Sequence, residues 1–301
     1  MPEEFRKRSV LAKAGSRDYA GNFSAGLFIV ATPIGNLGDI TLRALSVLDG
    51  VDCVACEDTR VGGGLLARYG IKKPLLPYHD HNAEGQRPKI IARIDAGEAV
   101  ALISDAGMPL IADPGFKLVR DCRERGLAVT VVPGANAALT ALAGSGLPSD
   151  AFSFAGFLPP KKTARRTAIG ALAGAPGTLV FYEAPQRLAA ALGDLAEILG
   201  ADREAAIARE LTKLFEETRR GTLGELAGHY AANAAKGEIV IVVGPADTAA
   251  AKTQSADLEK TLKENLRALS LRDAVAATAT TTGAKKSAVY ALALRLVGKD
   301  K

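Results

Sequence analysis

Several kinds of residue and segment are scarce in this chain of 301 residues. It has no tryptophan and only three cysteines, and no apolar run approaches the roughly 20 residues that a membrane-spanning helix needs. Three cysteines do not form a disulfide framework in a chain this long, so we expect a reducing, cytoplasmic setting and no membrane. The opening residues contain neither the apolar segment nor the cleavage site of a signal peptide, so we expect no secretory signal.

The composition otherwise is that of a folded protein with a mild excess of positive charge. Hydrophobic residues make up 48% of the chain, which excludes disorder over its whole length. Lys and Arg number 38 against 33 Asp and Glu, a net charge of +5. That charge allows a nucleic-acid partner without requiring one, because many other enzymes are as basic.

Short apolar runs alternate with helical stretches in the first half of the chain. The runs are rich in Val, Ile and Ala and cover 27–32, 51–56, 99–104 and 127–132. Such runs suit strands buried on both faces of a parallel sheet, joined by helices in right-handed crossovers. One of these helices is expected to have Asp113 as its N-cap and Pro114 as its first residue, and to end before Gly126.

The pattern changes near Leu147, where a second set of strands begins. One of them, at 213–221, has no helix before it, so this half is predicted to hold a mixed sheet. We therefore expect an α/β protein divided into a flexible basic arm (1–25), an N-terminal α/β domain (26–146), a C-terminal α/β domain (147–246), a linker (247–257) and a helical unit (258–301). In that unit Ser270 and Asp273 resemble a capping box, and Gly283 separates two amphipathic helices.

Three loops that follow strands are rich in glycine and proline. They cover 32–39, 104–109 and 133–137. Ligands of open α/β sheets lie outside the carboxyl ends of the strands, so three such loops at one edge predict a cofactor site. No G-x-G-x-x-G follows the first strand and no phosphate-binding G-x-x-x-x-G-K-[ST] occurs, which argues against a dinucleotide or a triphosphate.

Two pairs of residues have spacings that are found in metal sites. Cys53 and Cys56 form a C-x-x-C, but positions three apart in a strand face opposite ways, so both are expected to pack in the core. His79 and His81 share a face of extended chain, yet no third ligand lies near them, so no metal is expected. They suit contacts with an RNA phosphate instead.

Basic residues form separated clusters that favour a polyanionic partner, although each cluster alone could be a solvated helix face. The residues that we expect to contact such a substrate are His79, His81, Lys161, Lys162, Arg165, Lys285 and Lys286.

The loops occur in an order that resembles a known family. Along the chain come ATPIGNLGDIT, EDTR, HDHN, SDAGMPLIADPG, VPGANAALTALAGSGLPSD, GFLPPKK, FYEAPQR, ARELTKLFEE and GEIVIVVG. This series closely resembles the ribosomal RNA small-subunit cytidine 2′-O-methyltransferases, which have the tetrapyrrole-methylase fold and use S-adenosylmethionine. The resemblance covers about 26–245 and extends to the terminal helices.

The resemblance implies two α/β domains with the methyl donor, S-adenosylmethionine, in the cleft between them. It also implies a homodimer that acts on 16S ribosomal RNA of the small ribosomal subunit. Met108 stands where the family usually has threonine. The residues implied to contact the donor are Pro33, Ile34, Gly35, Asp105, Ala106, Gly107, Met108, Pro133, Gly134, Asn136, Ala137 and Tyr182, with the region of Gly237 and Glu238 closing the adenine side.

Methyl transfer to a ribose hydroxyl needs an acceptor for the hydroxyl proton. Carboxylates at Glu57, Asp58, Asp80 and Glu183 follow strands or motif loops, and we favour Glu57 or Asp58 as the catalytic base. Arg60 would orient that carboxylate or hold a phosphate. The alternative is that Asp58 and Arg60 only cap the next helix.

Two other functions stay open at this point. One is a methylase of a small tetrapyrrole, and the other is a non-catalytic RNA-binding assembly factor that keeps the fold. The basic clusters and the terminal helices favour the ribosomal RNA methyltransferase over the first of these.

Overall fold

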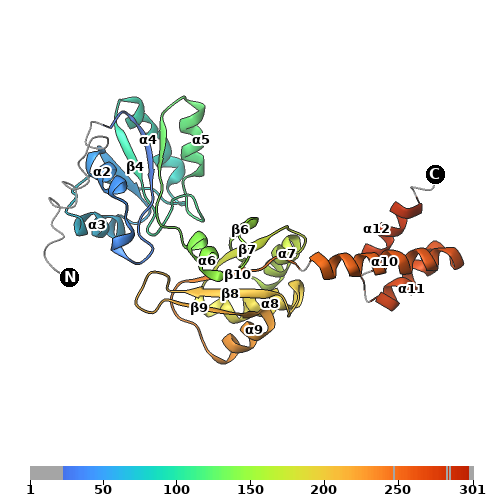
Figure 1. The fold of residues 1–301 in the computed structure, drawn as a ribbon. Helices are drawn as coiled ribbons and strands as arrows, with labels where there is room; N and C mark the ends of the chain where they lie inside the picture. Colours follow the sequence, from blue (N-terminus) through green and yellow to red (C-terminus); the bar gives the residue numbers. More distant parts are fainter. Residues whose placement is uncertain (1–22, 247, 283, 285, 298–301) are drawn as a thin grey trace. The chain divides into compact units, whose positions relative to one another are not determined.

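The computed structural model describes residues 23–246, 248–282, 284 and 286–297. The chain divides into two compact units, Met1–Gly244 and Pro245–Lys301 (Figure 1). Most of the expected N-terminal arm lies outside the described residues. No helix in the described part of the chain has both the length and the apolar character that crossing a membrane requires.

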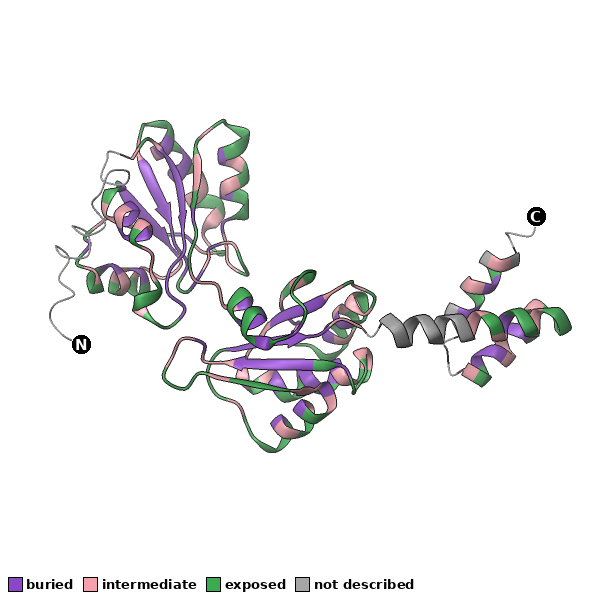
Figure 2. Ribbon diagram, viewed as in Figure 1, coloured by how far each residue is buried: buried purple, intermediate pink, exposed green. Residues whose placement is uncertain are grey.

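The first half of the larger unit is built on a parallel sheet of five strands. Their order is β3-β2-β4-β1-β5, and every pairing is parallel. The bounds are β1 Gly26–Val30, β2 Cys53–Cys56, β3 Leu75–Pro77, β4 Ala99–Leu102 and β5 Val129–Val132. The strands β1, β2 and β4 are buried along their whole length, as their apolar runs predicted (Figure 2).

Helices cover both faces of this sheet. Cys56 belongs to the core that packs under α2 (Leu42–Gly50) and α3 (Thr59–Arg68). Cys53 belongs to the core under α4 (Ala83–Asp95) and α5 (Phe116–Glu124). The two thiols are therefore on opposite faces and buried, which confirms the prediction that C-x-x-C is a packing feature here.

The start of α5 differs from the prediction. Its N-cap is Gly115, with φ +134°, and Asp113 lies in the preceding loop. That loop takes left-handed conformations at Leu110 (φ +72°) and Ala112 (φ +66°), so the helix cannot begin before Gly115. The prediction for Gly126 is confirmed, because this residue has φ +72° directly after the C-cap.

The second half of the larger unit contains the predicted mixed sheet, in the order β6-β7-β10-β8-β9. The first pair is parallel and the other pairs are antiparallel. The bounds are β6 Phe152–Phe157, β7 Thr178–Glu183, β8 Glu204–Arg209, β9 Glu217–Thr222 and β10 Ile239–Val243. The strand expected at 213–221 begins only at Glu217, because 211–216 form a turn.

One face of the mixed sheet carries α7 (Lys162–Leu172), α8 (Leu188–Leu199) and α9 (Leu223–Ala232). The opposite face carries α6 (Ala137–Ser145), whose Ala141 and Leu142 pack with residues of β8 and β10. Sequence alone grouped α6 with the first sheet, yet it packs on the second. This helix therefore brings the loop after β5 to the second sheet.

The smaller unit is a group of three helices, α10 (Thr248–Ala268), α11 (Leu271–Thr282) and α12 (Lys286–Val297). Their core includes Leu262, Val275 and Val289. The linker expected at 247–257 is instead helical from Thr248, because this stretch has no glycine or proline and many alanines. The predicted cap of α11 is confirmed, since the Asp273 amide donates to Ser270 Oγ at 3.3 Å.

Candidate active site

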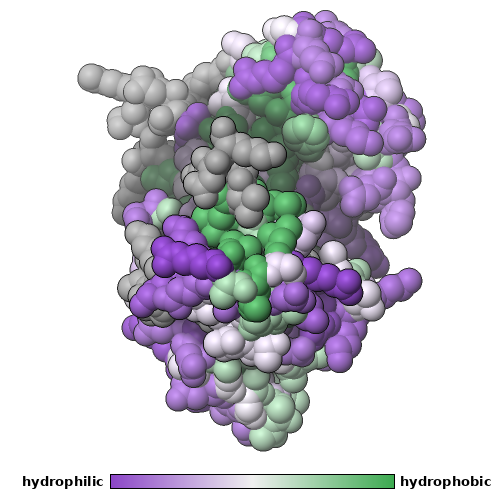
Figure 3. Space-filling view, turned by 90° about the vertical axis from the view of Figure 1, so that its right-hand side faces the viewer, coloured by the Kyte–Doolittle hydropathy of each residue, from purple (hydrophilic) through white to green (hydrophobic). Residues whose placement is uncertain are grey.

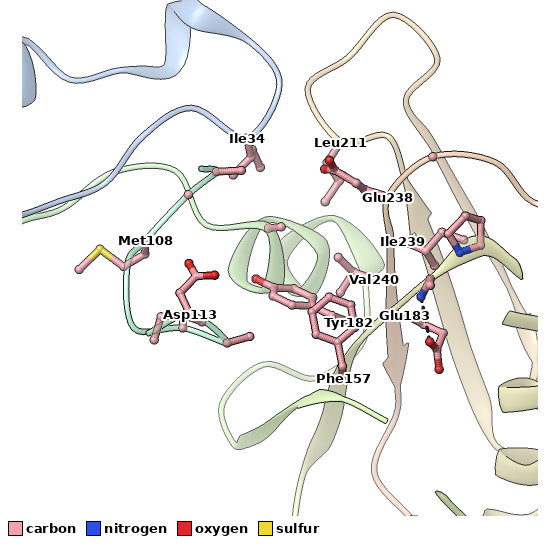
Figure 4. Close-up of a pocket in the computed structure, with 18 residues that line it drawn as sticks. Ile34, Met108, Asp113, Phe157, Tyr182, Glu183, Leu211, Glu238, Ile239 and Val240 are labelled. Carbon is pink, nitrogen blue, oxygen red and sulfur yellow. Dashed lines mark hydrogen bonds between the residues drawn. The ribbon is translucent and has the colours of Figure 1, made fainter. Parts of the chain in front are cut away.

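A cavity of about 370 Å³ opens where loops from both sheets meet within the larger unit (Figure 4). Ile34 follows β1, Gly107 and Met108 follow β4, and Ala137 begins α6. The other walls come from the second half, at the ends of β6, β7, β8 and β10. The full lining is Ile34, Ala106, Gly107, Met108, Ile111, Ala112, Asp113, Ala137, Phe157, Tyr182, Glu183, Ala184, Pro185, Leu211, Gly237, Glu238, Ile239 and Val240.

Reciprocal hydrogen bonds join the loops after β1 and β4. The Thr32 amide donates to the Gly107 carbonyl at 2.9 Å, and the Gly107 amide donates to the Thr32 carbonyl at 3.1 Å. The buried Ser104 hydroxyl adds a bond to the Gly107 carbonyl at 3.1 Å. Gly107 has φ +80°, which only glycine adopts at little cost, and its missing side chain leaves room for Ile34. One wall of the cavity is thereby held by backbone.

The opposite wall depends on Glu210, which follows β8. Its carboxylate accepts the Glu238 amide at 3.0 Å and pairs with Lys213 Nζ at 2.9 Å. The hydrogen bond from Lys213 is the main reason why the pKa of Glu210 is lowered. The backbone of Glu210 (φ +51°) and Thr212 (φ +66°) is left-handed without glycine, and such strain is concentrated at functional sites.

Two aromatic rings form part of the cavity wall. Tyr182 and Phe157 lie with their ring centroids 5.5 Å apart in an edge-to-face arrangement (Figure 4). The Tyr182 hydroxyl accepts the Ala138 amide at 3.3 Å, so its own proton stays available for a ligand. Burial raises the pKa of Tyr182, which keeps this hydroxyl a donor at neutral pH.

Asp113 projects its carboxylate into the cavity (Figure 4). Burial raises the pKa of Asp113 to about 6, and the charges of Glu57, Asp105 and Asp80 act in the same direction. Burial also raises the pKa of Glu57, again with help from Asp105 and Asp80. These four carboxylates, which we call the carboxylate cluster, follow β2, β3 and β4 at one edge of the parallel sheet.

Asp58 and Arg60, two of the predicted catalytic residues, are engaged with one another. Asp58 Oδ1 accepts the Arg60 amide at 2.8 Å as the N-cap of α3, and Oδ2 pairs with the guanidinium at 2.6 Å. The hydrogen bonds from Arg60 lower the pKa of Asp58 to about 2, which makes it a poor proton acceptor. The geometry matches the capping alternative, and neither residue lines the cavity.

Glu57 and Glu183, two of the other candidate bases, differ in their surroundings. Glu57 belongs to the carboxylate cluster but is not among the residues that line the cavity. Glu183 lines the cavity, yet its carboxylate turns away from the centre, where it accepts the Ala184 amide and pairs with Arg187 at 2.6 Å (Figure 4).

Six of the twelve residues predicted to contact the methyl donor line this cavity. Ile34, Ala106, Gly107, Met108, Ala137 and Tyr182 line it, as do Gly237 and Glu238. The other predicted residues do not line it: Pro33, Gly35, Asp105, Pro133, Gly134 and Asn136. Asn136 is the N-cap of α6, and its side chain accepts the Leu139 amide at 3.0 Å. The structure adds Asp113, Phe157 and Leu211 to the lining, for which the sequence offered only their closeness to motif loops.

The predicted RNA contacts fall into different environments. Arg165 was wrongly included, since its side chain is buried and pairs with Asp194 at 2.7 Å. Lys161, Lys162 and Lys286 are exposed, and Lys285 lies outside the described residues. The rings of His79 and His81 are 6.0 Å apart. Within the described parts of the chain, no group of three or more His, Cys, Asp or Glu side chains could hold a metal ion.

Two family models match the chain. Residues 26–227 match the tetrapyrrole (corrin/porphyrin) methylases, and residues 252–296 match the RsmI C-terminal HTH domain. The second match covers the three-helix unit almost completely. Both the α/β region and the terminal helices therefore have counterparts in known families.

Relatives and solved structures agree with these models. Ribosomal RNA small subunit methyltransferase I of Mesorhizobium japonicum is 52% identical over 90% of this chain and 92% of its own, and that of Escherichia coli O157:H7 is 45% identical over 93% and 98%. A uroporphyrin-III C-methyltransferase of Thermus thermophilus, complexed with S-adenosylhomocysteine, has the same fold, with TM-score 0.52 and 19% identity over 73% of this chain and 97% of its own. The chain belongs to the tetrapyrrole methylase family, in the branch whose curated members carry the name ribosomal RNA small subunit methyltransferase I.

Proposed function

We propose that this protein transfers a methyl group from S-adenosylmethionine to the ribose 2′-hydroxyl of a cytidine in 16S ribosomal RNA of the small ribosomal subunit. One observation carries this proposal above the others. Relatives named for this RNA are 44–52% identical to the chain, and the match extends through the terminal helices.

The cavity suits an adenosyl methyl donor. Its volume, about 370 Å³, lies within the range of roughly 300–1,000 Å³ found for pockets that hold small ligands. Ile34, Leu211 and Val240 offer apolar surface to a purine. Tyr182 and Glu238 offer polar groups for hydroxyls or an amino group, and Gly107 and Gly237 let backbone approach closely.

The bound donor would supply an electrophilic methyl group, and the protein would supply two further contributions to the reaction. It must align the ribose hydroxyl for in-line attack with the reacting atoms about 3–3.5 Å apart, which alone contributes much of the rate. It must also accept the hydroxyl proton, and the raised pKa values of Asp113 and Glu57 support the carboxylate cluster as the source of that acceptor.

A second candidate is methylation of a small tetrapyrrole, because solved methylases of that kind share the fold. Those structures are 16–24% identical and cover 72–73% of this chain. A likeness at that level concerns the fold alone, and it leaves the terminal helices without a role. The ribosomal substrate accounts for both parts of the chain.

The test is mass spectrometry of 16S ribosomal RNA from cells with and without the gene. We expect one ribose methyl on one cytidine to disappear in the deletion strain and to return with the gene. Purified protein should also methylate small subunits isolated from that strain. An unchanged methylation pattern, or transfer to a tetrapyrrole and not to the subunits, would contradict the proposal.

We also infer that the protein acts as a homodimer, on the resemblance to its family. Sedimentation equilibrium of the full chain tests this directly, with a mass near twice that of one chain as the expected result.

A further inference from the structure

A second cavity of about 380 Å³ lies within the first α/β half. It is formed by the segment between β3 and α4 and by the loop that leads into α5. His81 and Asp80 belong to its wall, and so does Asp113. Asp113 therefore lines both this cavity and the proposed donor cavity, which makes it a shared boundary of the two spaces.

The wall of the second cavity offers cationic groups for a phosphate and an aromatic ring for a base. Arg87 pairs with Asp121 at 2.6 Å, but its Nη1 is buried without a hydrogen-bond partner among the residues that the structure describes. A buried guanidinium nitrogen left unpaired is costly, and an anionic phosphate oxygen would satisfy it. Lys117, exposed on the same wall, adds a second positive charge.

Phe116 gives the cavity an aromatic surface. Its side chain lies in the first turn of α5 and is 67% exposed. The Arg120 guanidinium lies 6.0 Å from the ring centroid, so the ring already takes part in a cation–π contact. Bases of single-stranded RNA stack on such exposed rings.

We propose that this second cavity receives the acceptor nucleotide of the RNA and that Asp113, on the boundary of the two cavities, takes the proton from its ribose 2′-hydroxyl. The proposal rests on the function proposed above and names its acceptor site and its base. Phe116 would stack on a base, and Arg87 with Lys117 would hold phosphate.

The step balances in atoms and electrons. The ribose 2′-oxygen forms a bond to the methyl carbon, and the bond between that carbon and sulfur breaks with its electron pair left on sulfur. The hydroxyl proton passes to the Asp113 carboxylate and leaves later to solvent. No oxidant, reductant or metal ion takes part.

Asp113 fits this task better than the residues that the sequence favoured. Asp58 is held by Arg60, and Glu57 lines neither cavity. The groups that influence Asp113 are Glu57 after β2, Asp80 after β3, Ser104 and Asp105 after β4, and burial is the largest cause of its raised pKa, about 6. Tyr182 faces it from β7. Such a carboxylate is ionised at neutral pH and still basic enough to accept a proton.

The experiment compares Asp113→Asn with Asp95→Asn, a matched change at an exposed carboxylate that pairs with Arg125. Small subunits from the deletion strain serve as substrate, with saturating S-adenosylmethionine in single-turnover assays from pH 5 to 9. Calorimetry measures donor affinity, and filter binding measures affinity for the subunits. Phe116→Ala is compared with Phe152→Ala, another exposed phenylalanine.

We expect Asp113→Asn to lower the single-turnover rate at least 100-fold, the scale of a lost general base. The wild-type rate should rise through pH about 6, and the variant should lose this rise. Asp95→Asn should leave the rate and both affinities within about 3-fold. Phe116→Ala should weaken subunit binding about 5-fold or more, the scale of one lost stacking contact, and Phe152→Ala should not.

An Asp113→Asn enzyme that binds donor and keeps its rate within about 3-fold would overturn the assignment of the base. Unchanged subunit binding by Phe116→Ala would overturn the acceptor site. In both cases wild-type methylation of the subunits would still stand, so the function proposed above would survive. A wild-type enzyme without activity on the subunits would remove both proposals together.

Discussion

The two halves of the larger unit shift the pKa values of several carboxylates in opposite directions. In the first half, burial and neighbouring negative charges raise the pKa of Asp113 and Glu57. In the second half, hydrogen bonds from Arg209 lower the pKa of Glu217, and those from Lys213 lower that of Glu210. The first half also has carboxylates in ion pairs, among them Asp58 with Arg60 and Asp121 with Arg87. The difference is that the first half also keeps carboxylates with raised pKa values, which can exchange protons near neutral pH, at one edge of its sheet.

The buried ion pair in the second half is the strongest case of the structural use of charge. Asp194 binds Arg165 at 2.7 Å and Arg166 at 3.0 Å, and Arg165 and Asp194 are both buried. Burial alone would raise the pKa of Asp194, but the two guanidinium groups outweigh it and lower the pKa. Removing one partner would leave a buried charge uncompensated.

Asp194→Ala should therefore have a large effect on stability. We expect a loss of about 3–5 kcal/mol in the free energy of unfolding, measured by urea denaturation. Glu197→Ala is the matched control, because it breaks the more exposed pair with Arg166 and should lower the stability far less. Replacing Arg165 by Met and Asp194 by Leu together should recover most of the loss. Equal effects of the two single changes would contradict the contrast between buried and exposed pairs.

Gly237→Ala tests the contribution of the second half to the proposed donor cavity. Gly237 has φ +84°, and an added Cβ would overlap the Glu210 carboxylate that binds the Glu238 amide. We expect donor affinity by calorimetry to fall at least 10-fold, or about 1.4 kcal/mol. Gly97→Ala is the control, since Gly97 has φ +97° but open space around it. It should cost stability without weakening donor binding, whereas a similar loss of affinity would assign the effect to backbone strain alone.

Asp113→Asn tests whether the raised pKa of this carboxylate in the first half lowers the stability of the protein at neutral pH. The folded-state pKa of Asp113, about 6, lies above the usual 3.8, so the folded protein binds the proton more tightly and loses stability as pH rises between these values. Asparagine carries no such cost. At pH 8 we expect the variant to be about 1–2 kcal/mol more stable, a figure reduced for partial exposure, with the gain vanishing below about pH 4.

The measurement is the melting temperature of both proteins from pH 4 to 8. A gain of a few degrees at pH 8 that disappears at pH 4 is the expected result. Asp95→Asn, at an exposed carboxylate that pairs with Arg125, is measured alongside as the control. A constant difference between Asp113→Asn and wild type across this range would mean that the Asp113 charge is not the cause.

The sequence predicted buried strands and the loops that follow them better than it predicted edge strands and side-chain roles. Strands β1, β2 and β4 are fully buried, so their apolar runs identified them, whereas β3 is short, carries a proline and lies at an edge. Loops that line the proposed donor cavity follow β1 and β4, and they were selected from the sequence by that position. Motif membership was a weaker guide to side-chain roles. Asp105 shares a motif with Gly107, yet it does not line the cavity and instead accepts the Asp58 amide at 3.3 Å.

Two other residues show why the remaining roles escaped prediction. Asp113 precedes a proline, which is typical of an N-cap, and only the left-handed backbone at Leu110 and Ala112 moves the helix start to Gly115. Arg165 lies in a run of basic residues that suggests a surface, but helical spacing places it inward against Asp194. In each case contacts between distant segments decide the role, and local pattern does not report them.

The smallest expected effect concerns the terminal helices. Lys286 is exposed at the first residue of α12, within the region that matches a helix-turn-helix domain, and helices of that motif contact nucleic acid. Lys286→Ala should weaken subunit binding only a few-fold and reduce the salt dependence by about one phosphate contact. Lys260→Ala, an exposed lysine on α10, is the matched control. Donor affinity should not change in either variant, because the residues that line the proposed donor cavity all lie in the larger unit. Equal salt slopes for Lys286→Ala and wild type would indicate that this part of the unit serves packing and does not contact RNA.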